Sequence, residues 1–477
     1  MVFVVALACL ALGFALLALG WSRRGAFATD ILLRSSLSVG FGLGIFSVIF
    51  YFSLFCTFRN LLVVDAVVLA ALVAARAVQF RLGFIKPGVL AQSNDEQWPA
   101  QFRHTLTAAF AITLCVAAYS ALVRMLTFPH GDGWDAFAIW NLHARFLFLG
   151  GPHWRDGFTP LVGGSHPDYP LLLPAAVAHF WTFLGHDDPR VPAVIGIVFT
   201  FATAGVLFSA LSVLRGRVPA MMGAIALLTT PFFIEQGTAQ YADVPLSFFF
   251  LATIVLLCLF DGEPATTRGP GVLVLAGLAA GFAAWTKNEG MLFLLAVVVS
   301  RLLILVRQPK SPDIPIQAKP ASRIAVAQLL VAVVPGLLLV AYYKHSIGVP
   351  GDLFSDPVTA LPKLLDPARY WVIFSGYIKG FFRFGRWLWI PGTVLLVGLT
   401  VAFGRDARQT RQSGFRTSVL ALTLTLVGYF AVFLITPYDI HWHLRFSLVR
   451  LFLQLWPSTV FLSFLILQGT SSPSNSV

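Results

Sequence analysis

The chain has 477 residues, of which 57% are hydrophobic and 11% charged, and its mean hydropathy is +0.80. Soluble domains carry about 25% charged residues, so this composition excludes a soluble globular protein. The net charge of +12 does not indicate a nucleic-acid partner, because the basic residues are spread over many short loops without a stripe of interleaved aromatic residues. Basic residues at membrane interfaces explain the charge better.

Apolar runs recur along the whole chain, and each is long enough to cross about 30 Å of hydrocarbon. Backbone groups in lipid must bond within their own segment, so these runs predict helices rather than strands. The predicted fold class is an all-α integral membrane protein with about thirteen transmembrane helices. They lie near residues 1–21, 34–57, 60–79, 105–126, 191–214, 218–235, 244–260, 271–286, 290–307, 324–345, 387–403, 417–436 and 447–468.

The short basic loops predict the orientation in the membrane. Threading the helices in order places all of them on one side, namely Arg23/Arg24, Arg81–Lys86, Arg215/Arg217, Arg268, Arg307–Arg323 and Arg405–Arg416. The positive-inside rule identifies that side as the cytoplasm. In a plasma (inner) membrane, the N-terminus is then expected outside and the C-terminus in the cytoplasm. A crossing at the short apolar segment 170–185 would invert every later basic loop, so we expect an interfacial helix there.

The opposite, external side then receives three extended segments, 127–190, 346–386 and 437–446, and two short turns, 235–243 and 286–290. Most of the carboxylates fall on this side: Asp132, Asp135, Asp156, Asp168, Asp187, Asp188, Glu235, Asp243, Glu289, Asp352, Asp356, Asp366 and Asp439. Loops held on a rigid helical frame are where functional sites are normally built. The sequence therefore predicts a site on the outer face.

Two carboxylates, Asp132 and Asp135, follow the helix predicted at 105–126, with Trp134 between them. Either could cap the amphipathic helix that follows. A second carboxylate three residues away exceeds what a cap requires, and such a residue at a membrane interface is a candidate general base.

This segment resembles the first external loop of GT-C-fold glycosyltransferases, a superfamily that includes protein O-mannosyltransferases and the lipid A aminoarabinose transferase. The resemblance rests first on an Asp after a membrane helix and a Gly about fifteen residues later, here Asp135 and Gly150. Three further matches follow in the expected order: His166-Pro167-Asp168-Tyr169-Pro170-Leu171, Tyr241-Ala242-Asp243-Val244-Pro245 and Trp285-Thr286-Lys287-Asn288-Glu289-Gly290. The resemblance implies interfacial helices in the first large external loop.

The resemblance also implies a reaction. A sugar would pass from a polyprenyl-phosphate-linked donor to an acceptor hydroxyl (on a glycan, lipid or protein) that a carboxylate deprotonates. Asp135 is the first choice of base and Asp132 the second. We expect Lys287 to pair with that Asp or with the phosphate. The other motif residues expected to bind substrate are His166, Asp168, Tyr241, Asp243 and Glu289.

The C-terminal segment before the last predicted helix adds His443, Arg445 and Arg450 as candidates for binding the lipid phosphate. Arg450 lies inside an apolar run and is costly there unless it is paired. Snorkelling to lipid headgroups is the alternative for either arginine. His166 with Asp168, or His441 with His443, could supply a divalent metal site, but we expect hydrogen bonding or substrate shaping instead, and no metal ligand is assigned.

We divide the chain into N-terminal membrane helices of unknown role at 1–104, a GT-C-like catalytic core at 105–310 and C-terminal helices at 311–477. Two alternatives remain open. A transporter or flippase for lipid-linked glycans would place its charges mid-membrane within repeated halves. An O-antigen ligase or polymerase would use external Arg and His, which the C-terminal segment could mimic.

Overall fold

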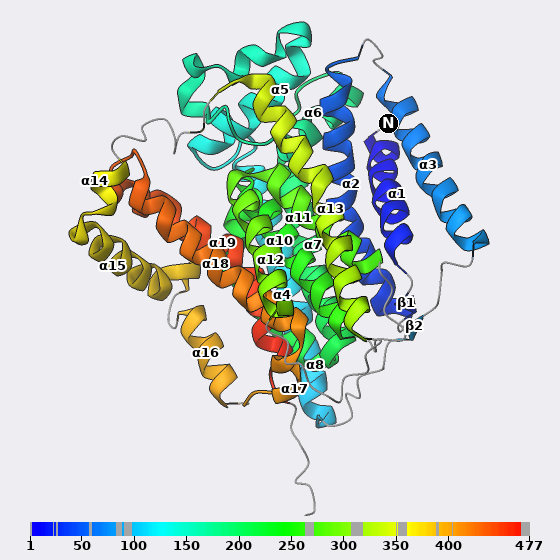
Figure 1. Cartoon of the computed structure of the whole chain (residues 1–477), viewed down its shortest axis with the longest axis vertical. Helices are drawn as coiled ribbons and strands as arrows, with labels where there is room; N and C mark the ends of the chain where they lie inside the picture. Colours follow the sequence, from blue (N-terminus) through cyan, green and yellow to red (C-terminus); the bar gives the residue numbers. More distant parts are fainter. Residues whose placement is uncertain are drawn as a thin grey trace, which may run out of the picture.

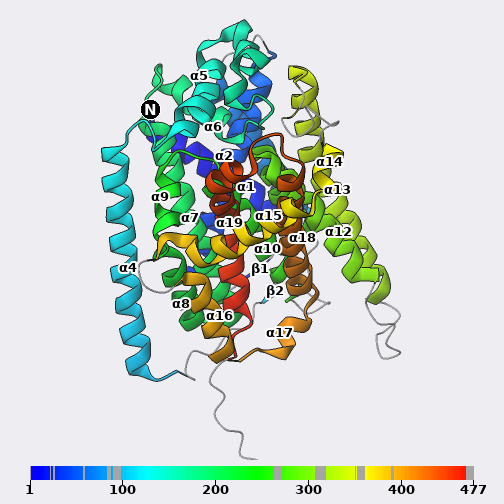
Figure 2. The ribbon, with the colours of Figure 1, turned by 90° about the vertical axis from the view of Figure 1, so that its left-hand side faces the viewer.

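The computed structural model describes residues 2–21, 23–24, 27–56, 60–82, 88–89, 98–262, 271–306, 318–349, 351, 360–387, 391–402 and 404–468. Of the residues noted from the sequence, Lys86, Arg268, Asp352, Asp356 and the loop 307–317 lie outside these ranges. The described chain is a bundle of helices (Figures 1 and 2).

In chain order the α-helices are α1 (Val2–Gly20), α2 (Phe27–Ser53), α3 (Leu61–Arg81), α4 (Ala100–Thr127), α5 (Asn141–Leu149), α6 (Leu172–Leu184), α7 (Arg190–Arg215), α8 (Arg217–Leu228), α9 (Pro231–Thr238), α10 (Asp243–Asp261), α11 (Gly271–Thr286), α12 (Asn288–Val306), α13 (Ala318–Ile347), α14 (Ala360–Leu364), α15 (Pro367–Arg383), α16 (Gly392–Ala402), α17 (Ala407–Arg411), α18 (Ser413–Ile435) and α19 (Ile440–Leu465). Shorter turns are η2 (Ala136–Trp140), η3 (Gly151–Phe158), η4 (Pro160–Ser165) and η6 (Phe384–Arg386). Two short strands, β1 (Arg23–Arg24) and β2 (Gly88–Val89), pair in parallel.

Nine of the described helices are long and apolar enough to cross a membrane, or ten if α8 and α9 form one bent span. The prediction of an all-α, multi-pass membrane protein is therefore confirmed. The count of thirteen is not established, because α11, α12 and α16, all predicted as crossings, are not among these nine. At thirteen residues, α6 is shorter than the nine, as expected for a helix that does not cross.

Two of the differences between the structure and the predicted helix boundaries follow from local chemistry. The segment 218–235 is two helices, α8 and α9, bent by 65°. Thr230 has an extended backbone, and Pro231 is the first residue of α9. Proline has no backbone N–H with which to continue the hydrogen bonds of α8, and its ring disfavours a helical conformation at the residue before it. The last helix begins at Ile440 rather than near 447, and Asp439 caps it by accepting a hydrogen bond from the Trp442 backbone N–H. The predicted loop 437–446 is therefore mostly helix.

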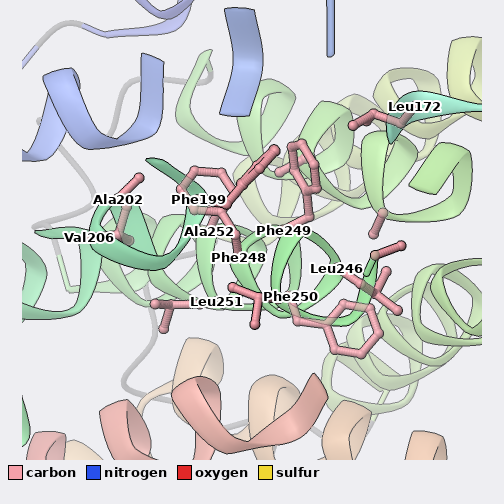
Figure 3. Close-up of a cluster of buried hydrophobic side chains, with 14 of the residues drawn as sticks. Leu172, Phe199, Ala202, Val206, Leu246, Phe248, Phe249, Phe250, Leu251 and Ala252 are labelled. Atoms are coloured by element: carbon pink, nitrogen blue, oxygen red, sulfur yellow. The ribbon is translucent and has the colours of Figure 1, made fainter. Parts of the chain in front are cut away.

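The core of the bundle is α10, which is buried over its whole apolar length. Figure 3 shows Phe248, Phe249 and Phe250 of α10 projecting in different directions among their neighbours. Phe248 packs edge-on against Phe199 of α7, and Phe250 stacks on Phe293 of α12 with ring centroids 3.9 Å apart. These aromatic contacts fix the position of the N-terminus of α10.

Close helix packing also depends on glycine. A Cβ at Gly336 of α13 would lie 2.4 Å from the Cα of Gly281 in α11, so the two backbones touch. Such small-residue contacts drive helix association where lipid removes the hydrophobic effect. They hold α13 against α11 and position the turn between α11 and α12.

The two ends of the bundle differ. In Figure 1, α5 and α6 lie at one end, whereas β1, β2 and α17 lie at the other. The basic segments Arg23/Arg24 and Arg405–Arg416 thus share the end opposite the loop that contains Asp135 and Asp168. This arrangement is the one expected from the charge pattern. The direction in which the molecule faces in the membrane stays a prediction.

A buried polar pair attaches α3 to the rest of the protein. The Asp65 carboxylate of α3 lies 3.1 Å from Nε2 of His179 in α6, and both side chains are almost fully buried. Phe46 of α2 stacks on the His179 ring at 3.9 Å. Because the apolar face of α3 is otherwise largely exposed, this pair specifies where the helix docks.

Replacing His179 with Leu should leave the Asp65 carboxylate buried without a partner. A buried unsatisfied polar group costs about 1–3 kcal/mol, so we expect the apparent unfolding temperature to fall by several degrees. The double variant Asp65→Leu/His179→Leu should recover most of this loss, because both polar groups are then absent. Intrinsic tryptophan fluorescence in detergent measures the transition, and Val67→Leu on the exposed face of α3 is the control. If the unfolding temperature of the double variant were lowered by the sum of the two single-variant effects, the result would contradict the pairing.

Candidate active site

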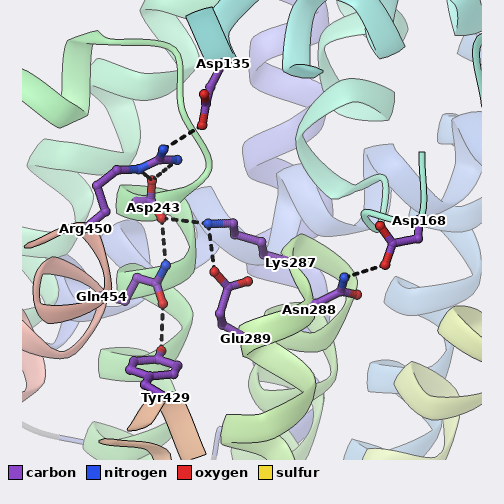
Figure 4. Close-up of polar contacts among 9 residues, drawn as sticks. All are labelled: Asp135, Asp168, Asp243, Lys287, Asn288, Glu289, Tyr429, Arg450 and Gln454. Carbon is purple, nitrogen blue, oxygen red and sulfur yellow. Dashed lines mark hydrogen bonds and ion pairs between the residues drawn. The ribbon is translucent and has the colours of Figure 1, made fainter. Parts of the chain in front are cut away.

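The centre of the candidate site is Arg450, which lies inside α19 and bridges two carboxylates (Figure 4). Its Nη1 donates to Asp135 Oδ2 at 2.6 Å, and its Nε and Nη2 both lie 2.8 Å from Asp243 Oδ2. Asp135 immediately precedes η2, and Asp243 is the first residue of α10. A guanidinium in an apolar helix is costly unless paired, and its planar fork suits two carboxylates at once. Arg450 therefore joins three elements of the fold.

A second cation, Lys287, extends the cluster from the other side of Asp243. Its Nζ lies 3.1 Å from Asp243 Oδ1 and 2.8 Å from Glu289 Oε1. Lys287 sits in the turn between α11 and α12, which brings this part of the chain to the N-terminus of α10. Although burial lowers the pKa of Lys287, the carboxylates of Asp243 and Glu289 raise it above its ordinary value. The ammonium group therefore stays charged.

Two uncharged side chains complete the environment of Asp243. Gln454 Nε2 donates to Asp243 Oδ1 at 2.7 Å, and the Tyr429 hydroxyl donates to Gln454 Oε1 at 2.6 Å. Asp243 thus receives hydrogen bonds or ionic contacts from Arg450, Lys287 and Gln454, and its side chain is fully buried. Asp243 is thus held by donors on both carboxylate oxygens and shielded from solvent.

Asp135 differs from Asp243 in exposure and in its contacts. Its side chain is 24% exposed, and Arg450 is its one side-chain partner among the described residues. The first-turn capping bond that the sequence suggested is absent, because the Asp135 carboxylate forms no hydrogen bond to the backbone of η2. Asp135 is therefore the more exposed of the two aspartates that Arg450 contacts.

Asp132, the second choice of base, lies apart from this cluster. Its carboxylate is 44% exposed and pairs with Arg124 of α4. Its backbone carbonyl accepts a hydrogen bond from the Tyr241 hydroxyl at 3.2 Å. The flanking Gly133 has φ of +122°, and a Cβ there would lie 2.5 Å from the Tyr241 oxygen. Glycine is required at this position, and it turns the chain so that Asp132 and Asp135 point to different partners.

Tyr241 lies beneath the guanidinium group. The Cζ of Arg450 is 4.7 Å from the Tyr241 ring centroid, a cation–π distance. Burial raises the pKa of Tyr241 to about 12, so the phenol stays protonated. Tyr241 thus supports Arg450 and fixes the Asp132 loop through the same side chain.

A neighbouring polar cluster contains Asp168. Asn288 Nδ2 donates to Asp168 Oδ2 at 2.8 Å, and Lys344 Nζ donates to Asn288 Oδ1 at 2.9 Å. The Tyr343 hydroxyl donates to the Pro167 carbonyl at 2.7 Å. Because Asn288 lies between Lys287 and Glu289 in the chain, these bonds orient the turn that carries both residues into the Asp243 cluster.

The remaining predicted residues lie around the cluster rather than in it. His166 has φ of +50° and stacks on Tyr169 at 4.8 Å, and Lys287 Nζ is 5.7 Å from that Tyr169 ring. His443 Nδ1 lies 2.9 Å from the Thr436 hydroxyl oxygen. Arg445 is exposed on α19 with its guanidinium over Phe446. The structure thus brings Asp135, Asp243, Lys287, Glu289 and Arg450 together and leaves Asp132 and Arg445 outside.

Sequence reasoning missed Gln454, Tyr429, Asn288 and Lys344. Gln454 carried a usable signal, because a polar residue four positions after Arg450 in an apolar helix lies on the same face. Tyr429 had no such signal. Among the described residues, no group of three or more His, Cys, Asp or Glu is arranged to hold a metal ion.

Residues 165–341 match the model of the dolichyl-phosphate-mannose-protein mannosyltransferase family, whose members have the GT-C fold. The predicted resemblance to GT-C-fold glycosyltransferases is thereby confirmed. The matched range includes Asp168, Asp243 and Lys287 but neither Asp135 nor Arg450. No curated protein and no solved structure matches the chain significantly. The family match supports glycosyltransferase activity for this membrane protein.

The ion cluster predicts a large effect of losing Arg450. Arg450→Met leaves the buried Asp243 carboxylate without its guanidinium partner, which costs about 3–5 kcal/mol in buried pairs. We expect a clear drop in unfolding temperature. Arg450→Lys should recover part of it, since a lysine cannot contact both carboxylates through a planar fork. The matched control is Arg386→Met, which breaks an exposed pair with Glu235 and should change little. Equal losses in the two Met variants would contradict this account.

Proposed function

We propose that the chain transfers a sugar from a polyprenyl-phosphate-linked donor to an acceptor hydroxyl, with Asp135 as the general base. The observation that carries the proposal is the contrast between the two aspartates bound by Arg450. Asp243 is fully buried and surrounded by donors, whereas Asp135 is partly exposed and has a single side-chain partner. Of these two aspartates, only Asp135 combines partial exposure with a fixed position.

The reaction follows from this arrangement. The acceptor oxygen attacks the anomeric carbon and forms the new glycosidic bond, while the bond from that carbon to the phosphate oxygen breaks. The phosphate leaves with the bonding electrons, and the acceptor proton passes to Asp135 Oδ2. Arg450 Nη1 contacts that same oxygen. A donor phosphate that draws Nη1 away would gain a charge-assisted hydrogen bond and free Asp135 for the proton.

The other groups position this pair. Lys287 is nearly buried between Asp243 and Glu289, so its charge acts on the site at short range without direct access. The cluster contains two cations, Lys287 and Arg450. They pair with three carboxylates, those of Asp135, Asp243 and Glu289, so the cluster has a formal net charge of −1. An excess carboxylate suits a site that must take up a proton during each turnover. The family match favours this enzyme over the transporter and O-antigen ligase alternatives.

Asp135→Asn should abolish transfer while leaving the fold intact, because the amide keeps the shape but cannot accept the proton. General-base catalysis contributes about 10²–10⁴-fold, so we expect a loss of at least about a hundredfold in kcat. The assay incubates the purified protein with a panel of radiolabelled polyprenyl-phosphate sugars and identifies the labelled product. The control is Asp156→Asn, whose carboxylate is 70% exposed on the same external segment. Full activity in Asp135→Asn together with loss in Asp132→Asn would move the base to Asp132.

The proposed outer-face location can be tested by cysteine labelling. In a variant with Cys9, Cys56, Cys115 and Cys258 replaced by Ser, single cysteines are introduced as Trp134→Cys, Trp442→Cys and Arg408→Cys, all at exposed positions. A membrane-impermeant maleimide should label the first two in intact cells and the third only after permeabilisation. Labelling of positions 134 and 408 from the same side would refute the topology.

A further inference from the structure

A groove of about 350 Å³ lies between α15 and α19, away from the carboxylate cluster. Figure 2 shows α15 crossing in front of α18 and α19 on the side of the bundle. The residues that matter for its shape and charge are Gly376, Lys379, Gly380 and Arg383 of α15 and Leu444 and Arg445 of α19. His441 and Leu448 of α19 also line it.

Glycines on the inner face of α15 let this helix lie close to α19. Gly376 and Gly380 lie one turn apart and face Leu444 and Leu448, where a Cβ on either glycine would come within 3.3 Å of a leucine methyl. The opposite face of α15 exposes large apolar side chains, among them Trp371, Phe374 and Ile378. Such a helix, apolar on one face and basic along the other, is typical of a membrane interface.

The charge of the groove is positive. Lys379 and Arg383 come from α15, and Arg445 comes from α19. Among the residues that the structure describes, none of these three has a carboxylate within ion-pair distance. A single interfacial cation often only snorkels to lipid headgroups. Here three cations on two helices converge on one cavity with an apolar wall, which is the composition that an anionic amphiphile requires.

The groove is separate from the ion cluster because α19 lies between them. At 3.6 residues per turn, Arg445 and Arg450 are about 140° apart around the helix. The groove-lining residues His441, Leu444 and Leu448 share the face of Arg445, whereas Gln454 shares the face of Arg450. The two arginines therefore serve different ligands.

We propose that the α15–α19 groove binds an anionic phospholipid of the surrounding bilayer, with its phosphate at Lys379, Arg383 and Arg445 and its chains along the glycine and leucine wall. The bilayer is favoured over the donor as the source because the groove lies on a different face of α19 from Arg450, the residue that contacts Asp135. The bound lipid ties α15 to α19 and so stabilises the folded protein by mass action. This proposal does not depend on the transfer reaction.

The test uses the purified full-length protein in detergent, titrated separately with phosphatidylglycerol, phosphatidylcholine and undecaprenyl phosphate. Native mass spectrometry counts bound lipids, and the unfolding temperature reports stabilisation; neither readout requires sugar transfer. Each Lys or Arg near an anionic lipid contributes roughly a fivefold gain in affinity, so Lys379→Gln/Arg383→Gln/Arg445→Gln should bind phosphatidylglycerol roughly a hundredfold more weakly. The single variant Arg445→Gln should show a loss of about fivefold.

Two matched variants serve as controls. Lys379→Arg/Arg383→Lys/Arg445→Lys keeps the charge and should retain the lipid. Arg408→Gln/Arg411→Gln/Arg416→Gln removes the same charge from exposed positions in and beside α17 and should bind as the unmodified protein does. Equal phosphatidylglycerol binding by the groove variant and the unmodified protein would overturn the proposal. Preferential binding of undecaprenyl phosphate would also overturn it and make the groove a site for the donor carrier.

Discussion

The contact of Arg450 with both Asp135 and Asp243 is the constraint on which the rest of the site depends. Charges buried in a membrane protein must be paired, and these partners are 315 and 207 residues distant in the sequence. The pairing therefore requires α19, the N-terminus of α10 and the loop before η2 to meet at one point. The aromatic packing around α10 and the glycine contact between α11 and α13 hold the elements close enough for this to occur.

The same contact separates scaffold from reactive group. A carboxylate that accepts from Arg450, Lys287 and Gln454 at once gains stability from every donor and has no capacity left for a substrate. A carboxylate with one partner and an open side is held in place yet can exchange that partner. Asp243 and Asp135 represent these two cases on one guanidinium group.

Much of the fold was predictable from sequence, because apolar length alone specifies a membrane helix. The predicted helix boundaries were wrong where a single capping or helix-breaking residue, rather than average hydropathy, determines where a helix begins. Pro231 breaks the segment that hydropathy joined into one helix, and Asp439 caps a helix whose first turns are too polar to look membrane-spanning. Both are recognised start signals, and both were outweighed by the average character of the window.

The site was predictable only in part. That Arg450 must have a partner follows from its place in an apolar run, but which carboxylate it contacts depends on long-range packing that one sequence does not encode in any local pattern. The sequence ranked Asp135 before Asp132 as the base, but it did not show that the positive φ of Gly133 directs the two carboxylates to different cations. The role of Asn288 was also not predictable from the local sequence, because its hydrogen-bond partner, Asp168, lies 120 residues earlier.

Arg445 and Arg450 illustrate how helix geometry assigns function. The sequence places Arg445 in a predicted loop and Arg450 in the apolar run that follows, and both were candidates for binding the lipid phosphate. Once α19 starts at Ile440, five residues of helix place the two guanidinium groups about 140° apart, and they cannot serve one ligand. Arg450 pairs with two carboxylates, because a charge within an apolar helix is costly unless it is paired. The exposed arginine is free to bind an external anion, and the neighbouring cations of α15 strengthen that preference. On this proposal, one face of α19 contacts the carboxylate cluster and another contacts the bilayer.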